Sequence, residues 1–133
     1  MSRVAQVILV VDQDDDGQVE DIAFWMAADG PRSDDRTSSR VGALMPLAGA
    51  VGEDLWGGFK SITVSVWGAV TNHLDWDGFL ERIASTPWAA PDRVQLLMKS
   101  ESDPYFRIYM FWDGRLVNIA PPPNGDKGWP YPD

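Results

Sequence analysis

The sequence Leu74-Asp-Trp-Asp-Gly-Phe-Leu-Glu-Arg-Ile-Ala-Ser85 decides the fold, because no other segment of the chain has so clear a helical pattern. Its apolar residues recur at steps of three and four, which places them on one face of a helix: Trp76, Phe79, Leu80 and Ile83. Asp75 is a favoured N-cap residue, and Leu74 and Phe79 have the spacing of a hydrophobic staple. We therefore predict a main helix over about 75–85 that packs on one face of a sheet.

Strand patterns lie on both sides of this helix. They are rich in β-branched and aromatic residues and cover 4–11, 61–70, 93–100, 105–112 and 115–119. Asp113-Gly114 is the strongest hairpin signal, because a type I′ turn needs positive φ angles. The last three of these strands should form a meander. The connection from 61–70 to 93–100 is long enough for a crossover, so these two strands need not be neighbours.

Residues 19–27 fit two patterns. Alternation of Ile22, Phe24 and Met26 with their neighbours favours a strand, whereas the spacing of Val19, Ile22 and Met26 fits a helix. We choose the strand, because a short Asp-Gly turn after 4–11 makes an antiparallel hairpin the nearest solution. The expected fold is α+β: one domain over 1–120, with an antiparallel sheet of about six strands and one main helix.

Three segments lack a regular pattern. Residues 29–40 read as a flexible loop that begins with Gly-Pro. Residues 41–59 are apolar but contain five glycines and Pro46, which predicts one or two short helical turns packed on the domain. Residues 121–133 contain five prolines and read as an extended tail.

Composition restricts the classes of function. The chain has 133 residues and no cysteine, which excludes disulfides, thiolate zinc sites and a cysteine nucleophile. It has no apolar run of about 18 residues, so we expect a cytoplasmic protein without a membrane anchor. The formal charge of -9 would repel a nucleic acid and attract a basic protein or a cation.

The sharpest chemical pattern is the acidic run that begins at Asp12. Asp12, Asp14 and Asp16 followed by Gly17 match the start of a calcium loop, with Glu20 or Asp21 as completing ligand. An EF-hand needs Glu at the twelfth position, where this chain has Ala23. The candidate metal ligands are thus Asp12, Asp14, Asp16 and Glu20. The same residues also suit a solvated turn that binds no ion.

Catalytic patterns are scarce. His73 is the only histidine, and a residue at a strand-to-helix junction is usually a capping or packing residue. Asp75 and Asp77 are explained by helix capping, and no nucleophile elbow or phosphate loop is present. We therefore lean towards a protein that is not an enzyme.

Seven tryptophans are more than a small core can enclose together with five phenylalanines. Trp67 alternates with the apolar residues of 61–70, which would place it outside the helix-covered core. Exposed tryptophan is typical of protein interfaces. The candidate partner-binding residues are Trp56, Trp67, Trp129 and Asp15.

These features favour a non-enzymatic protein-binding domain that engages a basic partner through an acidic, tryptophan-rich surface. A small, acidic, cysteine-free α+β domain is similar in type to the immunity proteins that neutralise bacterial toxins, which implies an inhibitor of a basic protein. No residue string carries this resemblance, so no site residues follow from it. The alternative is a small-molecule or calcium-binding domain, or an enzyme, in which 41–59 forms a lid beside His73 and Trp67.

Overall fold

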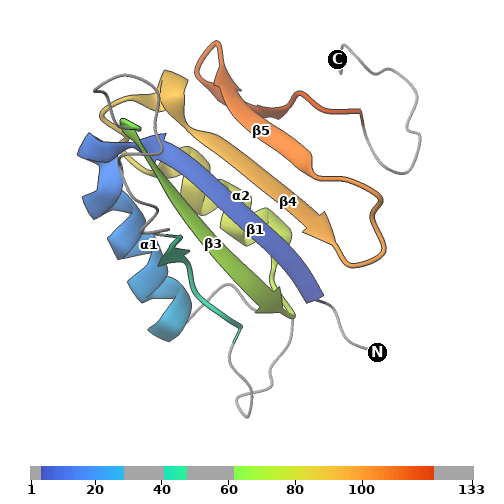
Figure 1. The fold of residues 1–133 in the computed structure, drawn as a ribbon. Helices are drawn as coiled ribbons and strands as arrows, with labels where there is room; N and C mark the ends of the chain where they lie inside the picture. The colour runs from blue at the N-terminus through green and yellow to red at the C-terminus, as the bar shows by residue number, and fades with distance from the viewer. Residues whose placement is uncertain (1–3, 29–40, 48–61, 122–133) are drawn as a thin grey trace.

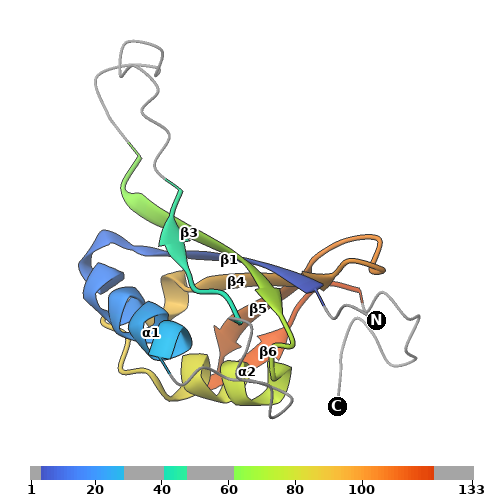
Figure 2. The same cartoon turned by 90° about the horizontal axis from the view of Figure 1, so that it is seen from below.

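A computed structural model describes residues 4–28, 41–47 and 62–121. It has one six-stranded antiparallel sheet in the order β2-β3-β1-β4-β5-β6, and both α-helices lie on the same face of the sheet (Figures 1 and 2). The elements in chain order are β1 (Val4–Asp12), η1 (Gln13–Asp15), α1 (Asp16–Ala28), β2 (Met45–Pro46), β3 (Val64–Asn72), α2 (Trp76–Ser85), η3 (Pro91–Arg93), β4 (Gln95–Ser100), β5 (Arg107–Trp112) and β6 (Arg115–Asn118). The predicted α+β fold is confirmed.

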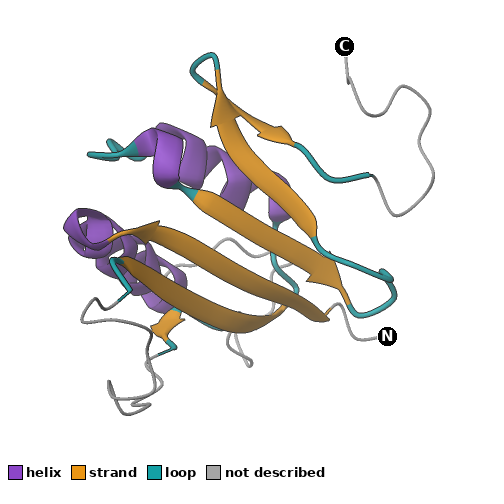
Figure 3. Cartoon of the chain, turned by 45° about the horizontal axis from the view of Figure 1, so that its top comes forward, coloured by secondary structure: helices purple, strands orange, loops and turns teal. Residues whose placement is uncertain are grey.

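Strand β1 is the centre of the sheet and pairs antiparallel with β3 and β4. Its residues Val7, Leu9 and Val11 face the helices and are at most 1% exposed. Because β1 separates β3 from β4, the chain crosses between them through α2, as predicted. The meander of β4, β5 and β6 is also confirmed (Figure 3).

Two local predictions have different outcomes. Asp113 and Gly114 have φ angles of 52° and 76°, as a type I′ turn between β5 and β6 requires. Helix α2 begins after its N-cap Asp75, but the Asp75 side chain makes no capping hydrogen bond. Leu74 and Phe79 are both buried in the core, as the staple spacing predicts.

The prediction of a strand over 19–27 is wrong, because these residues lie in helix α1. Val19, Ile22 and Met26 are buried on one side of that helix, so the three- and four-residue spacing prevails over the alternation. The acidic run is therefore a helix start and not a hairpin turn. The sixth strand is instead the short β2, which pairs with β3 through Met45 and Pro46.

The predicted orientation of the 61–70 strand is also wrong. In β3 the alternation is present, but Trp67 faces the helices and is only 7% exposed. Val64 and Val70 lie on the opposite face and are exposed. Trp67 belongs to the core because its Nε1 donates a hydrogen bond to Asp16 Oδ1 at 3.1 Å, which satisfies the one polar group of the ring.

The irregular segments are described only in part. Within 41–59, residues 41–47 form β2 and its approach, and Val41 and Leu44 are buried in the core. The remainder of that segment, the 29–40 loop and the tail beyond Pro121 lie outside the described residues. In the described ranges, none of the helices has the length and hydropathy that a bilayer span requires.

Candidate functional site

The acidic run holds the junction between β1 and α1 together. Asp15 is fully buried, and its Oδ1 and Oδ2 accept hydrogen bonds from the backbone N–H groups of Ala89 and Ala90 at 2.7 and 3.0 Å. Asp16 accepts from Trp67 Nε1 through Oδ1 and from Ser65 Oγ through Oδ2. These two carboxylates therefore tie the start of α1 to two other parts of the chain.

Asp12 is bound on the other side of the junction. Its Oδ2 accepts from the Asp14 backbone N–H at 3.0 Å, and its Oδ1 accepts from Arg93 Nη1 at 2.7 Å. The backbone hydrogen bond from Asp14 and then the Arg93 guanidinium hold the pKa of Asp12 below its ordinary value. A carboxylate so engaged is less available to a cation.

The structure thus shows the positions of the predicted calcium ligands but does not bring them together at one site. Asp12 and Asp16 bind different protein groups, while Asp14 and Glu20 are exposed. Over residues 4–28, 41–47 and 62–121, no three His, Asp or Glu side chains are grouped so that they could hold a metal ion. Calcium binding stays a prediction that this geometry does not favour.

The predicted partner-binding residues are placed as follows. Asp15 and Trp67 are 0% and 7% exposed, so neither is presented to a partner in this structure. Trp56 and Trp129 lie outside the described residues. His73 lies between β3 and α2 with a left-handed φ of 59°.

The suggested lid has no counterpart in residues 41–47. The Val41 carbonyl accepts from the Asn72 backbone N–H, and the Leu47 N–H donates to the Val66 carbonyl, both at 2.8 Å. This part of the segment is therefore attached to β3. Residues 48–59 lie outside the described residues.

Negative charge gathers on the helix layer, which we define as η1, α1, α2 and η3. Within the described part of the chain its exposed carboxylates are Asp14, Glu20, Asp21, Asp77, Glu81 and Asp92. Its two arginines are engaged: Arg93 binds Asp12, and the Arg82 guanidinium lies 4.9 Å from the centre of the Trp25 ring. The helix layer therefore presents a surplus of free carboxylates.

An exposed aromatic residue lies among these carboxylates. Phe24 on α1 is 78% exposed, and Glu20 and Asp21 precede it by four and three residues, which places them beside it on the same face of the helix. Aromatic residues are enriched at the centres of protein interfaces and polar residues at their rims, and Phe24 with these two acids fits that arrangement. The sequence interpretation missed Phe24 because the strand assignment of 19–27 placed it on the same face as Ile22 and Met26, which are buried.

A groove of about 320 Å³ runs beside this patch, between α1 and α2. Gln18 Nε2 donates to the Pro87 carbonyl at 3.1 Å and joins the two walls of the groove. Its lining residues are Gln18, Asp21, Ile22, Arg82, Ser85, Thr86 and Pro87. Asp21 thus belongs both to the groove and to the surface around Phe24. We call Glu20, Asp21, Phe24 and this groove the acidic patch.

The opposite face of the sheet has a different character. The register places two rows of side chains across it, and neither row contains a charged residue. The first row is Met45, Gly68, Ile8, Leu97 and Ile108; the second is Val66, Val10, Gln95, Met110 and Val117. No described helix or strand covers these rows (Figure 2), and only the Leu47 side chain, which packs over Gly68, is known to lie against them. We call this surface the open face.

Comparison with known proteins adds no assignment: no family model matches the chain, and no curated protein or solved structure is detectably similar to it. The candidate site therefore depends on the geometry alone.

Proposed function

We propose that this protein is a non-enzymatic binding domain that engages a basic protein partner through the acidic patch. The observation that carries the proposal is the 78% exposure of Phe24 beside Glu20 and Asp21. An isolated exposed apolar side chain needs no explanation. Here the side chain lies on the same helix as Asp21, which lines the groove, and the charged residues one turn before it, Glu20 and Asp21, are both acidic.

The chemistry of the patch indicates what a partner would present. A lysine or arginine can lay its apolar stem along the exposed Pro87 while its charged end approaches Asp21. An apolar surface next to that side chain would cover Phe24 and exclude water from the contact. The remaining carboxylates of the helix layer add long-range attraction, which raises the rate of association more than it lowers the rate of dissociation.

The similarity in type to immunity proteins gives this proposal a finer form. In that form the basic partner is a toxin, and binding at the acidic patch neutralises it by covering a basic surface that the toxin needs. The net charge of -9 supports this form, because a strong field speeds the capture of a basic protein.

Capture from a native cell extract at low and high salt tests the proposal. The tagged protein should retain a stoichiometric basic protein that is released as salt rises, and Phe24→Ala should weaken the purified complex about tenfold or more. Asp21→Asn should weaken the complex mainly at low salt, because the charge that it removes is screened at high salt.

Asp113→Asn is the matched control. It removes one exposed carboxylate from the turn between β5 and β6, where Asn is equally suited to the backbone conformation, so binding should stay unchanged. A partner held equally well by the Phe24→Ala variant would overturn the proposal. So would the absence of any salt-sensitive partner together with thermal stabilisation by a metabolite.

A further inference from the structure

The open face carries a second inference, which concerns a different surface from the acidic patch. Ile8, Val10, Leu97 and Met110 occupy adjacent strands on this face and are only partly buried. The one polar residue among them is the exposed Gln95, whose Nε2 donates to Met110 Sδ at 3.7 Å. At its corners Val70 and Trp112 are 68% and 76% exposed. A contiguous apolar surface of this extent marks an interaction site.

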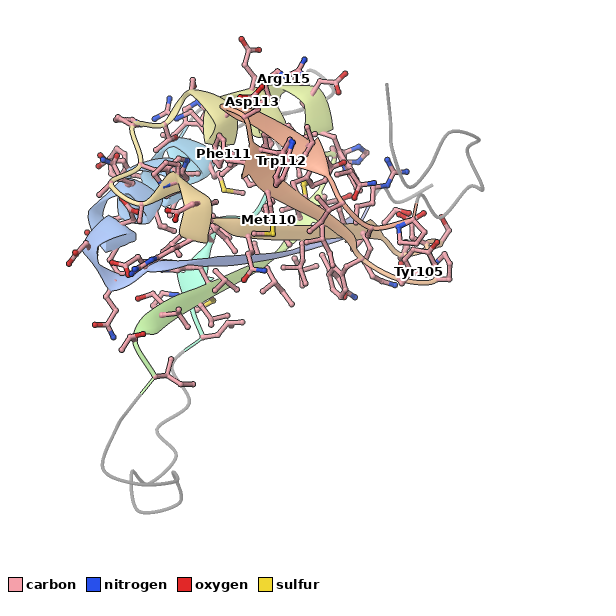
Figure 4. The ribbon with its side chains drawn as sticks, turned by 90° about the horizontal axis from the view of Figure 1, so that it is seen from above. Tyr105, Met110, Phe111, Trp112, Asp113 and Arg115 are labelled. Atoms are coloured by element: carbon pink, nitrogen blue, oxygen red, sulfur yellow. The ribbon has the colours of Figure 1, made fainter. Side chains whose placement is uncertain are left out.

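The strands that form this face have sequences typical of burial on both sides. Strand β1 is apolar at nearly every position, and its helix-facing side chains are completely buried. Strand β5 is apolar or aromatic from Ile108 to Trp112, yet none of its residues is fully buried. Met110 lies on the side of β5 away from the helices and Phe111 on the helix side (Figure 4). The helices thus bury only one of the two apolar sides of these strands.

The distribution of charged residues over the two sides of the sheet indicates which kind of partner the open face can bind. A basic partner would find no carboxylate within the two rows, whereas the acids of the helix layer lie on the other side of the sheet. Because the exposed carboxylates of the helix layer lie on the other side of the sheet, two copies can pack through their open faces without bringing these carboxylates close together. This holds although each copy carries a charge of -9. We infer that the open face binds the open face of a second copy, so that two sheets pack into a sandwich with the helices outermost.

The size of the face agrees with this occupant. When every outward position of the six strands is counted, which adds Gln6, Lys99, Asp12 and Arg115 at the margins of the two rows, strands about 4.8 Å apart give a face of about 600 Å² per copy. Stable interfaces bury about 1,200 to 2,000 Å² in total, so the two faces together reach the lower end of that range. Sheets pack face to face at a separation of about 10 Å, which apolar side chains of this size fill.

Mass measurement over a concentration series tests the inference. The full chain should shift from monomer to dimer with a dissociation constant of about 1 to 100 µM, as an interface of modest area predicts. Leu97→Lys places a charge at the centre of the face and should shift the protein to monomer. Trp112→Ala changes only an exposed corner, so it should weaken the dimer at least several-fold without risk to the fold.

Ala84→Lys is the matched control, because it adds the same charge at an exposed position of α2 and should leave the dimer intact. Circular dichroism of each variant verifies folding. A chain that is monomeric at all concentrations would overturn the inference, as would a dimer that persists in folded Leu97→Lys. If the full chain is a monomer, and removal of residues 122–133 increases the binding of a dye that detects exposed apolar surface, then this segment and not a second copy covers the open face. Each of these results leaves the proposed function untouched, since Phe24 lies on the other side of the sheet.

Discussion

At the residue scale, Asp15 has the clearest structural role in the molecule. It is the one charged side chain among the fully buried residues described, and two backbone N–H groups on the segment before η3 depend on it. A carboxylate that accepts two N–H bonds in this way is satisfied without a counter-cation, and it fixes the position of the chain that donates to it.

Removing this carboxylate should destabilise the protein strongly. In Asp15→Ala the N–H groups of Ala89 and Ala90 lose their acceptors, and we expect a loss of about 3 kcal/mol in the free energy of unfolding. Asp14→Ala changes an exposed neighbour and should cost less than about 0.5 kcal/mol. Urea unfolding of both variants measures the difference. Equal effects would contradict the assignment of the buried contacts.

The acidic run also shows where sequence reasoning reaches its limit at this scale. The spacing of Asp12, Asp14 and Asp16 is compatible with a calcium loop and with a helix start, because both use short carboxylates near a turn. What separates the two interpretations is the set of donors on distant segments, such as Trp67 and Arg93. Contacts between residues so far apart in the chain leave no local pattern to read.

At the element scale, the two helices join each other through Trp25 and Arg82. The guanidinium lies 4.9 Å from the centre of the ring, and Arg82 also lines the groove of the acidic patch. This contact therefore fixes the walls of the groove as well as the packing of α1 against α2.

A double-mutant cycle measures this contact. Trp25→Leu and Arg82→Met keep an apolar side chain at each position while removing the cation–π attraction, and their coupling energy should be about 0.5 to 1 kcal/mol. The cycle compares the free energies of unfolding of the wild type, both single variants and the double variant. If the effects of the two single substitutions on the free energy of unfolding are additive in the double variant, the two side chains lie near each other without a stabilising interaction.

Elements whose signals are local were predicted correctly. Helix α2 has a strong amphipathic period, and the β5–β6 turn is set by two adjacent residues, Asp113 and Gly114. Helix α1 was missed because apolar residues lie on more than one side of it: Phe24 is exposed while Val19 and Ile22 are buried. An apolar residue on the outer face of a helix weakens the periodic signal and mimics the alternation of a strand.

At the scale of the whole molecule, the sequence predicted the α+β class, the crossover and the terminal meander, but not which face of the sheet the helices cover. A strand such as β3 alternates in either orientation, and Trp67 suits a core or an interface equally well. The candidate site depended on this choice. Because Trp67 lies in the core, two other surfaces remain as candidate binding sites. They are Phe24 with Glu20 and Asp21 on the helix side of the sheet, and the apolar rows on the open face.

These two faces should respond to salt in opposite directions. The acidic patch attracts a basic partner through charge, so raising the ionic strength should weaken that complex. The open face joins two chains that each carry -9 charges mainly through apolar contact, so salt should screen their repulsion and leave self-association equal or stronger. Sedimentation of the chain alone and of its partner complex, in one salt series, measures both effects. If self-association and partner binding weaken together, a single charged surface serves both, and the separation of the two faces is wrong.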